Sequence, residues 1–299
     1  MLGRGRIGDV ATYVDVDEVG DPRLADFRDL ARADRRPDRP GGRGVVLAEG
    51  VPVVQRLLGS PYPVRAVLGV PAKIEALRPD LAPVEVPVYA GSAELMAGVV
   101  GFHLNRGVLA AADRAPVPDL GGLLATARRI IVCEGVNDHE NLGALFRNAA
   151  ALGVDAVLLG DRCADPLYRR GVRVSMGHVL RVPFAPLPGW PDGGLGLLRA
   201  AGFTVLALTP NRPSVPLAEL VPTEVVPTER VALLVGAEGP GLSEAALAGV
   251  DARVRIPMAD GVDSLNVATA AAIAVYALAA PLSPDDHRAS GVIGDQQAH

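Results

Sequence analysis

Lysine and cysteine are both rare in this chain. The 299 residues contain 2 cysteines and a single lysine, Lys73, so nearly all of the 29 basic residues are arginines. Cys133 and Cys163 lack the spacing of a zinc site or of a disulfide framework. Cysteine-poor chains without disulfides are typical of reducing compartments. We therefore expect a cytoplasmic protein whose two cysteines lie in the core.

Motifs for a nucleotide phosphate or a metal ion are also missing from the sequence. A phosphate-binding loop needs a lysine directly after its glycines, and Lys73 has no such neighbours. His103, His139 and His178 each stand alone, without a second histidine at the spacing of metal ligands. The sequence therefore predicts no metal site.

Apolar runs are too short to cross a membrane. The alanine-rich stretch 267–280 falls short of the roughly 20 apolar residues that a spanning helix needs, and we predict a buried helix there. The N-terminus carries Arg4 and Arg6 without an apolar core, which is unlike a signal peptide. We expect no membrane partner.

The composition that is present favours a globular protein of two domains. Hydrophobic residues make up 49% of the chain and the mean hydropathy is +0.26, enough to bury a sizeable core. The net charge of −5 and the pI near 5.6 argue against a protein that coats nucleic acid nonspecifically. They leave room for a local basic patch of arginines, whose guanidinium groups suit bidentate contacts with phosphates.

The chain divides into segments of different composition. Residues 1–44 are rich in arginine and are either an RNA-facing arm or a solvated surface helix with a loop. Residues 45–112 alternate short β-branched runs with helical patterns, which predicts a small α/β domain. The remaining segments are an expected linker at 113–126, a second α/β domain at 127–282 and a disordered tail at 283–299.

In the second domain, apolar strands alternate with amphipathic helices. The expected strands are residues 129–133, 156–159, 179–183, 204–208, 231–236 and 252–257, and the expected helices are residues 142–152, 167–176, 193–201, 244–248 and 265–279. This alternation predicts a mostly parallel sheet that is covered by helices on both faces. Ligands of such sheets bind at the carboxyl ends of the strands.

The first of three unusual segments, residues 137–150, follows a predicted strand. Asn141 lies near the start of the next helix, and Arg147 follows about a turn and a half later. In the simplest interpretation Asn141 caps the helix and Arg147 is a surface residue. In the functional interpretation both belong to a site.

The other two unusual segments also end strands. In residues 234–243 an apolar strand runs into a glycine-rich turn, where small residues let the backbone approach a ligand closely. A tight turn without a ligand would have similar glycines. In residues 255–269, Asp263 or Ser264 could simply cap the last helix.

Together, in this order and at these separations, the three segments resemble the signature motifs of the SpoU (TrmH-type) RNA ribose methyltransferases of the SPOUT superfamily. The resemblance covers roughly residues 129–280, and residues 48–58 and 106–110 resemble the small substrate-binding domain of many family members. It implies an α/β domain folded as a deep trefoil knot, against the general rule that chains are not knotted. It also implies a homodimeric, S-adenosylmethionine-dependent enzyme that methylates a ribose 2′-hydroxyl of ribosomal or transfer RNA.

The resemblance assigns residues to the donor pocket and to the reaction. The donor pocket would be formed by Gly236, Ile256, Leu265, Leu208 and Thr209, and the reacting groups by Arg147, Asn141, Glu238, Ser264 and Asn266. Arg147 matches the family's catalytic arginine, for which the role of general base is one alternative. Because a guanidinium normally stays protonated, we favour a cation that stabilises the developing alkoxide and grips the adjacent phosphate. We expect Glu238 to orient Arg147.

Two alternatives to this function stay open on the sequence alone. A noncatalytic RNA-binding relative would keep the fold without binding the methyl donor. A SPOUT methyltransferase that modifies a base nitrogen would keep both the fold and the donor. The RNA, the nucleotide and the position that are modified do not follow from the sequence.

Overall fold

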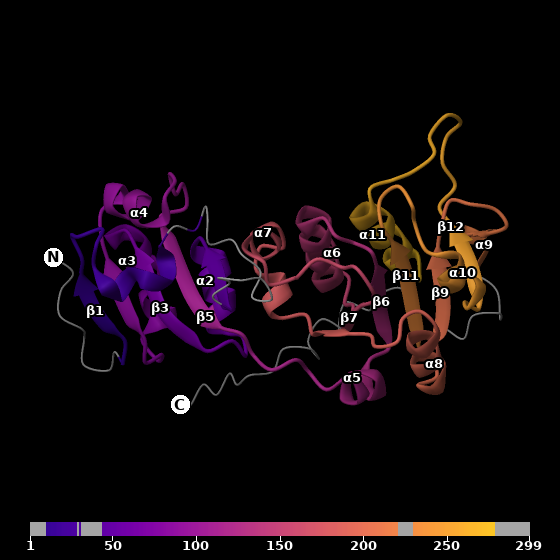
Figure 1. The fold of residues 1–299 in the computed structure, drawn as a ribbon, viewed down its shortest axis with the longest axis horizontal. Helices are drawn as coiled ribbons and strands as arrows, with labels where there is room; N and C mark the ends of the chain where they lie inside the picture. Colours follow the sequence, from indigo (N-terminus) through magenta and orange to yellow (C-terminus); the bar gives the residue numbers. More distant parts are fainter. Residues whose placement is uncertain (1–9, 29, 31–43, 221–229, 279–299) are drawn as a thin grey trace, which may run out of the picture.

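The chain forms two α/β domains, each built around one sheet (Figure 1). The computed structural model describes residues 10–28, 30, 44–220 and 230–278. The two sheets lie side by side along the long axis of the molecule, and α7 (Arg169–Val174) lies between them. The chain between the domains runs past α5 (Leu120–Thr126) into the second sheet.

The first sheet combines parallel and antiparallel strands. Its strands are β1 (Thr12–Asp15), β2 (Val45–Glu49), β3 (Val64–Gly69), β4 (Pro87–Ala90) and β5 (Val108–Asp113), in the order β1-β4-β3-β5-β2. β5 is antiparallel to β2 and β3, and the other pairs are parallel. The helices of this domain are α2 (Val51–Leu58), α3 (Pro71–Leu81) and α4 (Ala93–Val100). Because side chains alternate between the faces of a strand, Ala110 and Leu109 of β5 enter two different cores.

The predicted boundary of the first domain at residue 45 is wrong. β1 is an edge strand of the first sheet and pairs in parallel with β4. Leu24 and Phe27 of the 3-10 helix η1 (Pro22–Phe27) are fully buried in the core on one face of that sheet. The apolar residues of this segment are therefore buried by the sheet. Arginines 32–43 of the predicted arm lie outside the described residues.

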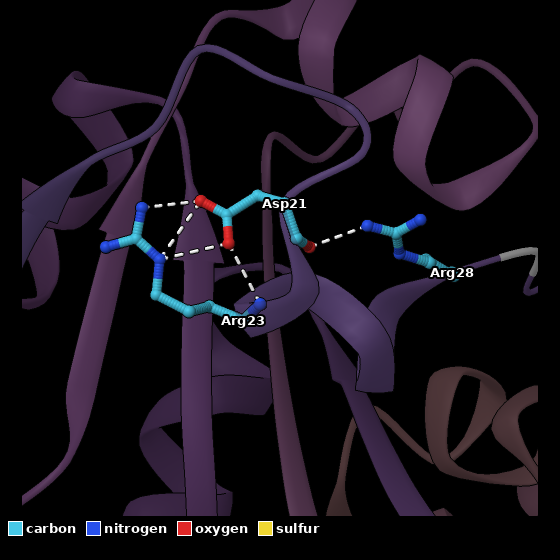
Figure 2. A network of polar contacts seen from close by, with 3 residues as sticks. All are labelled: Asp21, Arg23 and Arg28. Carbon is cyan, nitrogen blue, oxygen red and sulfur yellow. Dashed lines mark hydrogen bonds and ion pairs between the residues drawn. The ribbon is translucent and has the colours of Figure 1, made fainter.

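The arginines that the structure does describe in this segment stabilise η1 (Figure 2). The Asp21 carboxylate accepts hydrogen bonds from the backbone N–H of Arg23 (2.9 Å) and from its Nε (3.0 Å), and Arg28 Nη2 donates to the Asp21 carbonyl oxygen (2.6 Å). The Arg23 guanidinium holds the pKa of the Asp21 carboxyl below its usual value. Arg23 and Arg28, at the start and just after the end of η1, thus both bond to Asp21.

The second sheet is parallel throughout, which confirms the prediction from the alternating pattern. Its strands are β6 (Arg129–Glu134), β7 (Ala156–Leu159), β8 (Phe184–Pro186), β9 (Thr204–Leu208), β10 (Val215–Pro216), β11 (Val231–Gly236) and β12 (Ala252–Arg255), in the order β10-β12-β9-β11-β6-β7-β8. Every pair in this sheet is parallel. Strands that run in one direction place all their carboxyl ends at one edge.

Helices cover both faces of the second sheet. Besides α5 and α7, the helices of this domain are α6 (His139–Ala151), η2 (His178–Leu180), α8 (Asp192–Ala200), α9 (Leu217–Leu220), α10 (Glu244–Ala248) and α11 (Val267–Leu278). Leu124 of α5 and Leu198 of α8 pack on one face. Leu145 of α6 and Ala271 of α11 pack on the other face, in a core that continues to Val53 of the first domain.

Two predicted elements differ from the structure. The strand expected at 179–183 is replaced by η2, because Gly177 has φ +81° and starts a tight turn that buries Val179 and Leu180. Strand β8 begins at Phe184. The expected linker 113–126 ends in α5, which Asp119 caps by accepting from the Gly122 N–H (2.7 Å). The short β10 and α9 had no counterpart in the sequence prediction.

Two further expectations concern the path and the ends of the chain. The deep trefoil knot of the second domain stays a prediction. The tail expected at 283–299 lies outside the described residues. Within the described ranges, no helix has the length and apolar character to cross a membrane.

Candidate active site

A cavity of about 490 Å³ opens at the carboxyl ends of β9, β11 and β12. This is the edge of a parallel sheet at which ligands are expected, and the volume is within the range of small-molecule sites. The cavity walls include all five residues that the sequence assigned to the donor pocket, namely Leu208, Thr209, Gly236, Ile256 and Leu265. Glu238, Ser264 and Asn266 also line it.

Gly236 determines the shape of one cavity wall. A Cβ atom at this position would lie 2.2 Å from the carbonyl carbon of Gly241 and 2.4 Å from the nitrogen of Leu242. The turn between them is closed by the Gly241 N–H, which donates to the Ala237 carbonyl oxygen (2.9 Å). The glycine-rich turn therefore lies directly against the end of β11, which a larger residue would prevent.

Glu134 supports this wall from outside the cavity lining, and the sequence did not single it out. It ends β6, is 3% exposed, and its Oε2 accepts a hydrogen bond from the backbone N–H of Ser243 (2.8 Å). Ser243 in turn caps α10 by accepting from the Ala246 N–H (3.2 Å). A buried carboxylate that accepts a backbone hydrogen bond holds the far end of the glycine turn in place. The available signal was an acidic residue at the end of an otherwise apolar strand.

Asn266 joins the three motifs. Its Nδ2 donates to Asn141 Oδ1 (2.6 Å) and to Glu238 Oε1 (3.3 Å). Its Oδ1 accepts from the backbone N–H groups of Ala268 (3.0 Å) and Thr269 (3.3 Å) at the start of α11. Residues separated by more than one hundred positions are therefore brought to one point beside the cavity.

The simpler interpretations of Asn141 and Ser264 as helix caps are wrong. Asp138 caps α6, because its Oδ1 accepts from the N–H groups of Glu140 and Asn141 (2.8 Å each). Asn266, not Ser264, caps α11. Ser264 Oγ donates to Asp263 Oδ1 (3.3 Å) and lines the cavity. Both side chains are thus available to the site.

Arg147 is the one predicted site residue that the structure does not bring to this group. Its side chain is exposed on α6, is absent from the cavity walls, and forms no hydrogen bond or ion pair with any residue that the structure describes. Glu238 bonds to Asn266 instead of orienting Arg147.

Helix geometry explains why Arg147 lies apart from Asn141, Glu238 and Asn266. Residues three or four apart share one face of a helix, so Arg147 shares a face with Gly143 and Glu140. Glu140 pairs with Arg170 of α7 (2.6 Å), and a Cβ at Gly143 would lie 2.9 Å from the Gly171 carbonyl oxygen. This face of α6 therefore lies toward α7, whereas Asn141 lies toward α11.

The cavity fits a nucleoside-like ligand with a cationic group. The backbone N–H groups of Ile256, Met258 and Leu265 donate to no described residue, so a ligand in the cavity can accept from them. Glu238 supplies a carboxylate next to these donors. Opposite charges attract across such short distances, and S-adenosylmethionine combines an adenine that accepts hydrogen bonds with a sulfonium cation.

Neither cysteine lines the cavity. Burial raises the pKa of the Cys133 thiol well above its usual value, and it also raises that of Cys163. Cys133 is buried and Cys163 half-buried. In the part of the chain that the structure covers, no three His, Cys, Asp or Glu side chains are grouped in a way that could hold a metal ion.

The chain is similar to proteins that are named as RNA methyltransferases. Residues 128–276 match the SpoU rRNA Methylase family. An uncharacterized tRNA/rRNA methyltransferase of Mycobacterium tuberculosis is 58% identical over 262 residues, which are 88% of this chain and 90% of that protein. The 23S rRNA (guanosine(2553)-2′-O)-methyltransferase of Bacillus subtilis is 32% identical over 235 residues, which are 78% of this chain and 87% of that protein.

A solved structure has the same fold. The AdoMet-bound rRNA methyltransferase from Sinorhizobium meliloti superposes with a TM-score of 0.72 at 23% identity, over 89% of this chain and 97% of that chain. The resemblance that the three motifs indicated is thus confirmed, and with relatives this similar across both domains the chain belongs to the SpoU rRNA methylase family.

Proposed function

We propose that the protein transfers the methyl group of S-adenosylmethionine to a ribose 2′-hydroxyl of ribosomal RNA. The observation that supports this proposal most directly is that Asn266 forms hydrogen bonds with both Asn141 and Glu238 beside the cavity. Membership of the family supports the reaction, and the 23S rRNA 2′-O-methyltransferase of Bacillus subtilis supports the substrate class. The cytoplasmic location expected from the sequence is part of the same proposal.

The residues of the chain position the donor. When bound, S-adenosylmethionine supplies an electrophilic methyl group on a sulfonium. Ile256 and Leu265 hold the donor through their backbone groups, while Glu238 interacts with its positive charge. Asn141 and Asn266 hold Glu238 in place through the bonds described above. Positioning of this kind accounts for a large part of the rate of a bimolecular transfer.

The ribose hydroxyl must lose its proton to solvent water as its oxygen attacks the methyl group. It is a very weak acid, so a nearby cation that stabilises the developing alkoxide lowers the barrier. We assign this role to Arg147, whose guanidinium also binds the adjacent phosphate.

The position of Arg147 calls for a second copy of the chain. Exposed apolar side chains gather on α11 and in the loop before it, next to the cavity, and they are Val262, Leu265, Ile273 and Tyr276. Exposed apolar groups of this kind mark interaction surfaces. Within one chain, Arg147 lies on a different face of α6 from the cavity. A partner copy that covers the α11 face would place its own Arg147 at the cavity of the first chain.

The test is methyl transfer from labelled donor to ribosomal RNA. We expect Arg147→Ala to lower the turnover number by about 100- to 1,000-fold, with the donor affinity in calorimetry unchanged. A mixture of Arg147→Ala and Asn266→Ala chains should recover part of the activity, because one of the two sites in the mixed dimer keeps both groups.

The outcomes also decide between the alternatives. No donor binding at millimolar concentration would indicate a noncatalytic relative. A methyl group that mass spectrometry locates on the base would indicate methylation of a base nitrogen. Full activity of Arg147→Ala would refute the assigned role of that residue.

A further inference from the structure

Basic side chains from both domains converge where the domains meet. Arg56 lies on α2 of the first domain, Arg147 on α6 of the second, and His178 and Arg181 in and after the turn η2. α2 and α6 both pack against η2. These four residues, here called the junction cluster, include Arg147 but lie outside the donor cavity.

The contacts of η2 bring Arg56 to this place. Arg56 Nη1 donates to the Met176 carbonyl oxygen (2.9 Å), directly before the turn. Gly177 has φ +81°, and a Cβ on it would lie 3.4 Å from the Cβ of Arg56 and 3.1 Å from Cγ1 of Val53. The first domain therefore lies against the turn itself, and its helix α2 contributes a cation to the junction cluster.

The positive charges of the junction cluster have no counterions among the described residues. Arg56 bonds only to the carbonyl oxygens of Pro52 and Met176, and neither Arg147 nor Arg181 forms an ion pair with a described carboxylate. Neighbouring arginines differ, since Arg170 pairs with Glu140 (2.6 Å) and Arg114 pairs with Asp165.

The pKa of the His178 imidazole is lowered in part by the same excess of positive charge. Burial is the largest cause that lowers the pKa of its imidazole, and the positive charges of Arg56, Arg147 and Arg181 lower it further. Each of these causes acts in the same direction. Concentrated cations without carboxylates are the electrostatic signature of a site for an anion.

We propose that Arg56, Arg181 and His178 bind backbone phosphates of the RNA beside the nucleotide that Arg147 contacts, so that the substrate crosses from the second domain to the first at this junction. The inference rests on the proposed function. Guanidinium groups bind phosphates in a bidentate manner, and phosphate contacts fix the register of a nucleic acid without reading its sequence. The junction cluster therefore positions the RNA.

The first test measures binding of the full chain to a fluorescent oligouridylate of about 12 nucleotides, a length that one binding groove covers. Arg181→Glu should weaken binding about tenfold at roughly 0.1 M salt and reduce the slope of log affinity against log salt by about 1. Arg128→Glu is the matched control, because Arg128 is also exposed but lies directly before the start of β6, two strands away from β8, the strand that Arg181 precedes. Thermal melting should show both variants folded as the wild type is.

The second measurement is the pKa of His178 by NMR with and without the same oligonucleotide. A phosphate in the junction cluster should raise it, because the anion offsets the surrounding guanidinium charges. The Arg181→Glu variant should show a smaller rise. A merely structural role of His178 would give no change on addition of RNA.

Binding and methylation are read separately, so the two proposals can fail separately. Equal loss of affinity in Arg181→Glu and Arg128→Glu, or no loss in either, would overturn the phosphate site even if methyl transfer is normal. Specific loss in Arg181→Glu together with a shift of the His178 pKa would support the site even if no methyl group is transferred, in which case only the proposed function fails.

Discussion

The two sides of α6 differ in charge. On the side of Asn141, the donor cavity contains neutral amides and the carboxylate of Glu238. On the side of Arg147, the junction cluster contains three arginines and a histidine that no described carboxylate neutralises. The methyl donor is a cation and RNA is an anion, so each side complements one reactant. The comparison shows that a single helix separates a surface of neutral and acidic groups from a basic one.

Glycine is required on both sides, but for different contacts. In the donor cavity, the missing Cβ of Gly236 lets one stretch of backbone approach another. At the junction, Gly177 combines a left-handed conformation with close contact to α2. Substitution of each glycine therefore tests one side of the comparison without changing any charge.

The largest effect is expected from Gly236→Ala. The added methyl group would lie 2.2 Å from the backbone of Gly241, and forced repacking of this kind costs about 3 kcal/mol. We expect this loss in the free energy of unfolding measured with urea, together with weaker donor binding in calorimetry. RNA binding through the junction cluster should change less than donor binding.

Gly196→Ala is the control for this substitution. A Cβ at Gly196 of α8 would meet no atom within 4 Å, and alanine is favoured over glycine in helices by about 1 kcal/mol. Unchanged stability and donor affinity in Gly236→Ala would contradict the idea that this close approach shapes the cavity.

An intermediate effect is expected from Gly177→Ala. The left-handed φ of +81° costs an alanine about 1–2 kcal/mol, and its methyl group would press on Val53 at 3.1 Å. We expect a lower melting temperature and weaker binding of the oligouridylate, because the position of α2 relative to η2 changes. Donor affinity should be the same as in the wild type. If donor binding fell as much as RNA binding, the two sides of α6 would not be independent.

The smallest effect is a loss of stability at high pH from Tyr62, which is half-buried near Arg114 and Asp165. Burial raises the pKa of Tyr62 from 10.0 to about 12, the nearby Arg114 lowers it and Asp165 raises it. Because the folded pKa lies above the unfolded one, the neutral phenol stabilises the fold fully below pH 10. This stabilisation is lost as the pH rises from 10 through 12.

Urea unfolding at several pH values between 10 and 12 measures this loss. Tyr62→Phe cannot ionise, so its stability should fall less steeply over this interval than that of the wild type. Identical slopes in the two proteins would show that burial does not raise the pKa of Tyr62.

Sequence patterns predicted most of the second domain, and the resemblance to the SpoU family predicted the residues of the cavity. The parallel sheet follows from apolar runs at regular spacing, and the five predicted donor residues all line one cavity because parallel strands end at one edge. Errors occurred where local pattern competes with tertiary packing. The run 179–183 contains two valines and a leucine, yet Gly177 directs it into a buried turn. Residues 12–27 are rich in charge, yet they complete the first sheet and its core.

The sequence by itself determined the family, the alternation of strands and helices and the identity of the polar groups, because these depend on residue type and on spacing along the chain. Only the tertiary structure decided that Asn266 bonds to Asn141 and Glu238, that Glu134 holds the glycine turn, and that Arg147 faces the domain junction. Each of these depends on how distant segments pack and on the direction in which a helix turns its side chains. Hydrogen bonds and uncompensated charges between such segments leave no periodic signal in the sequence.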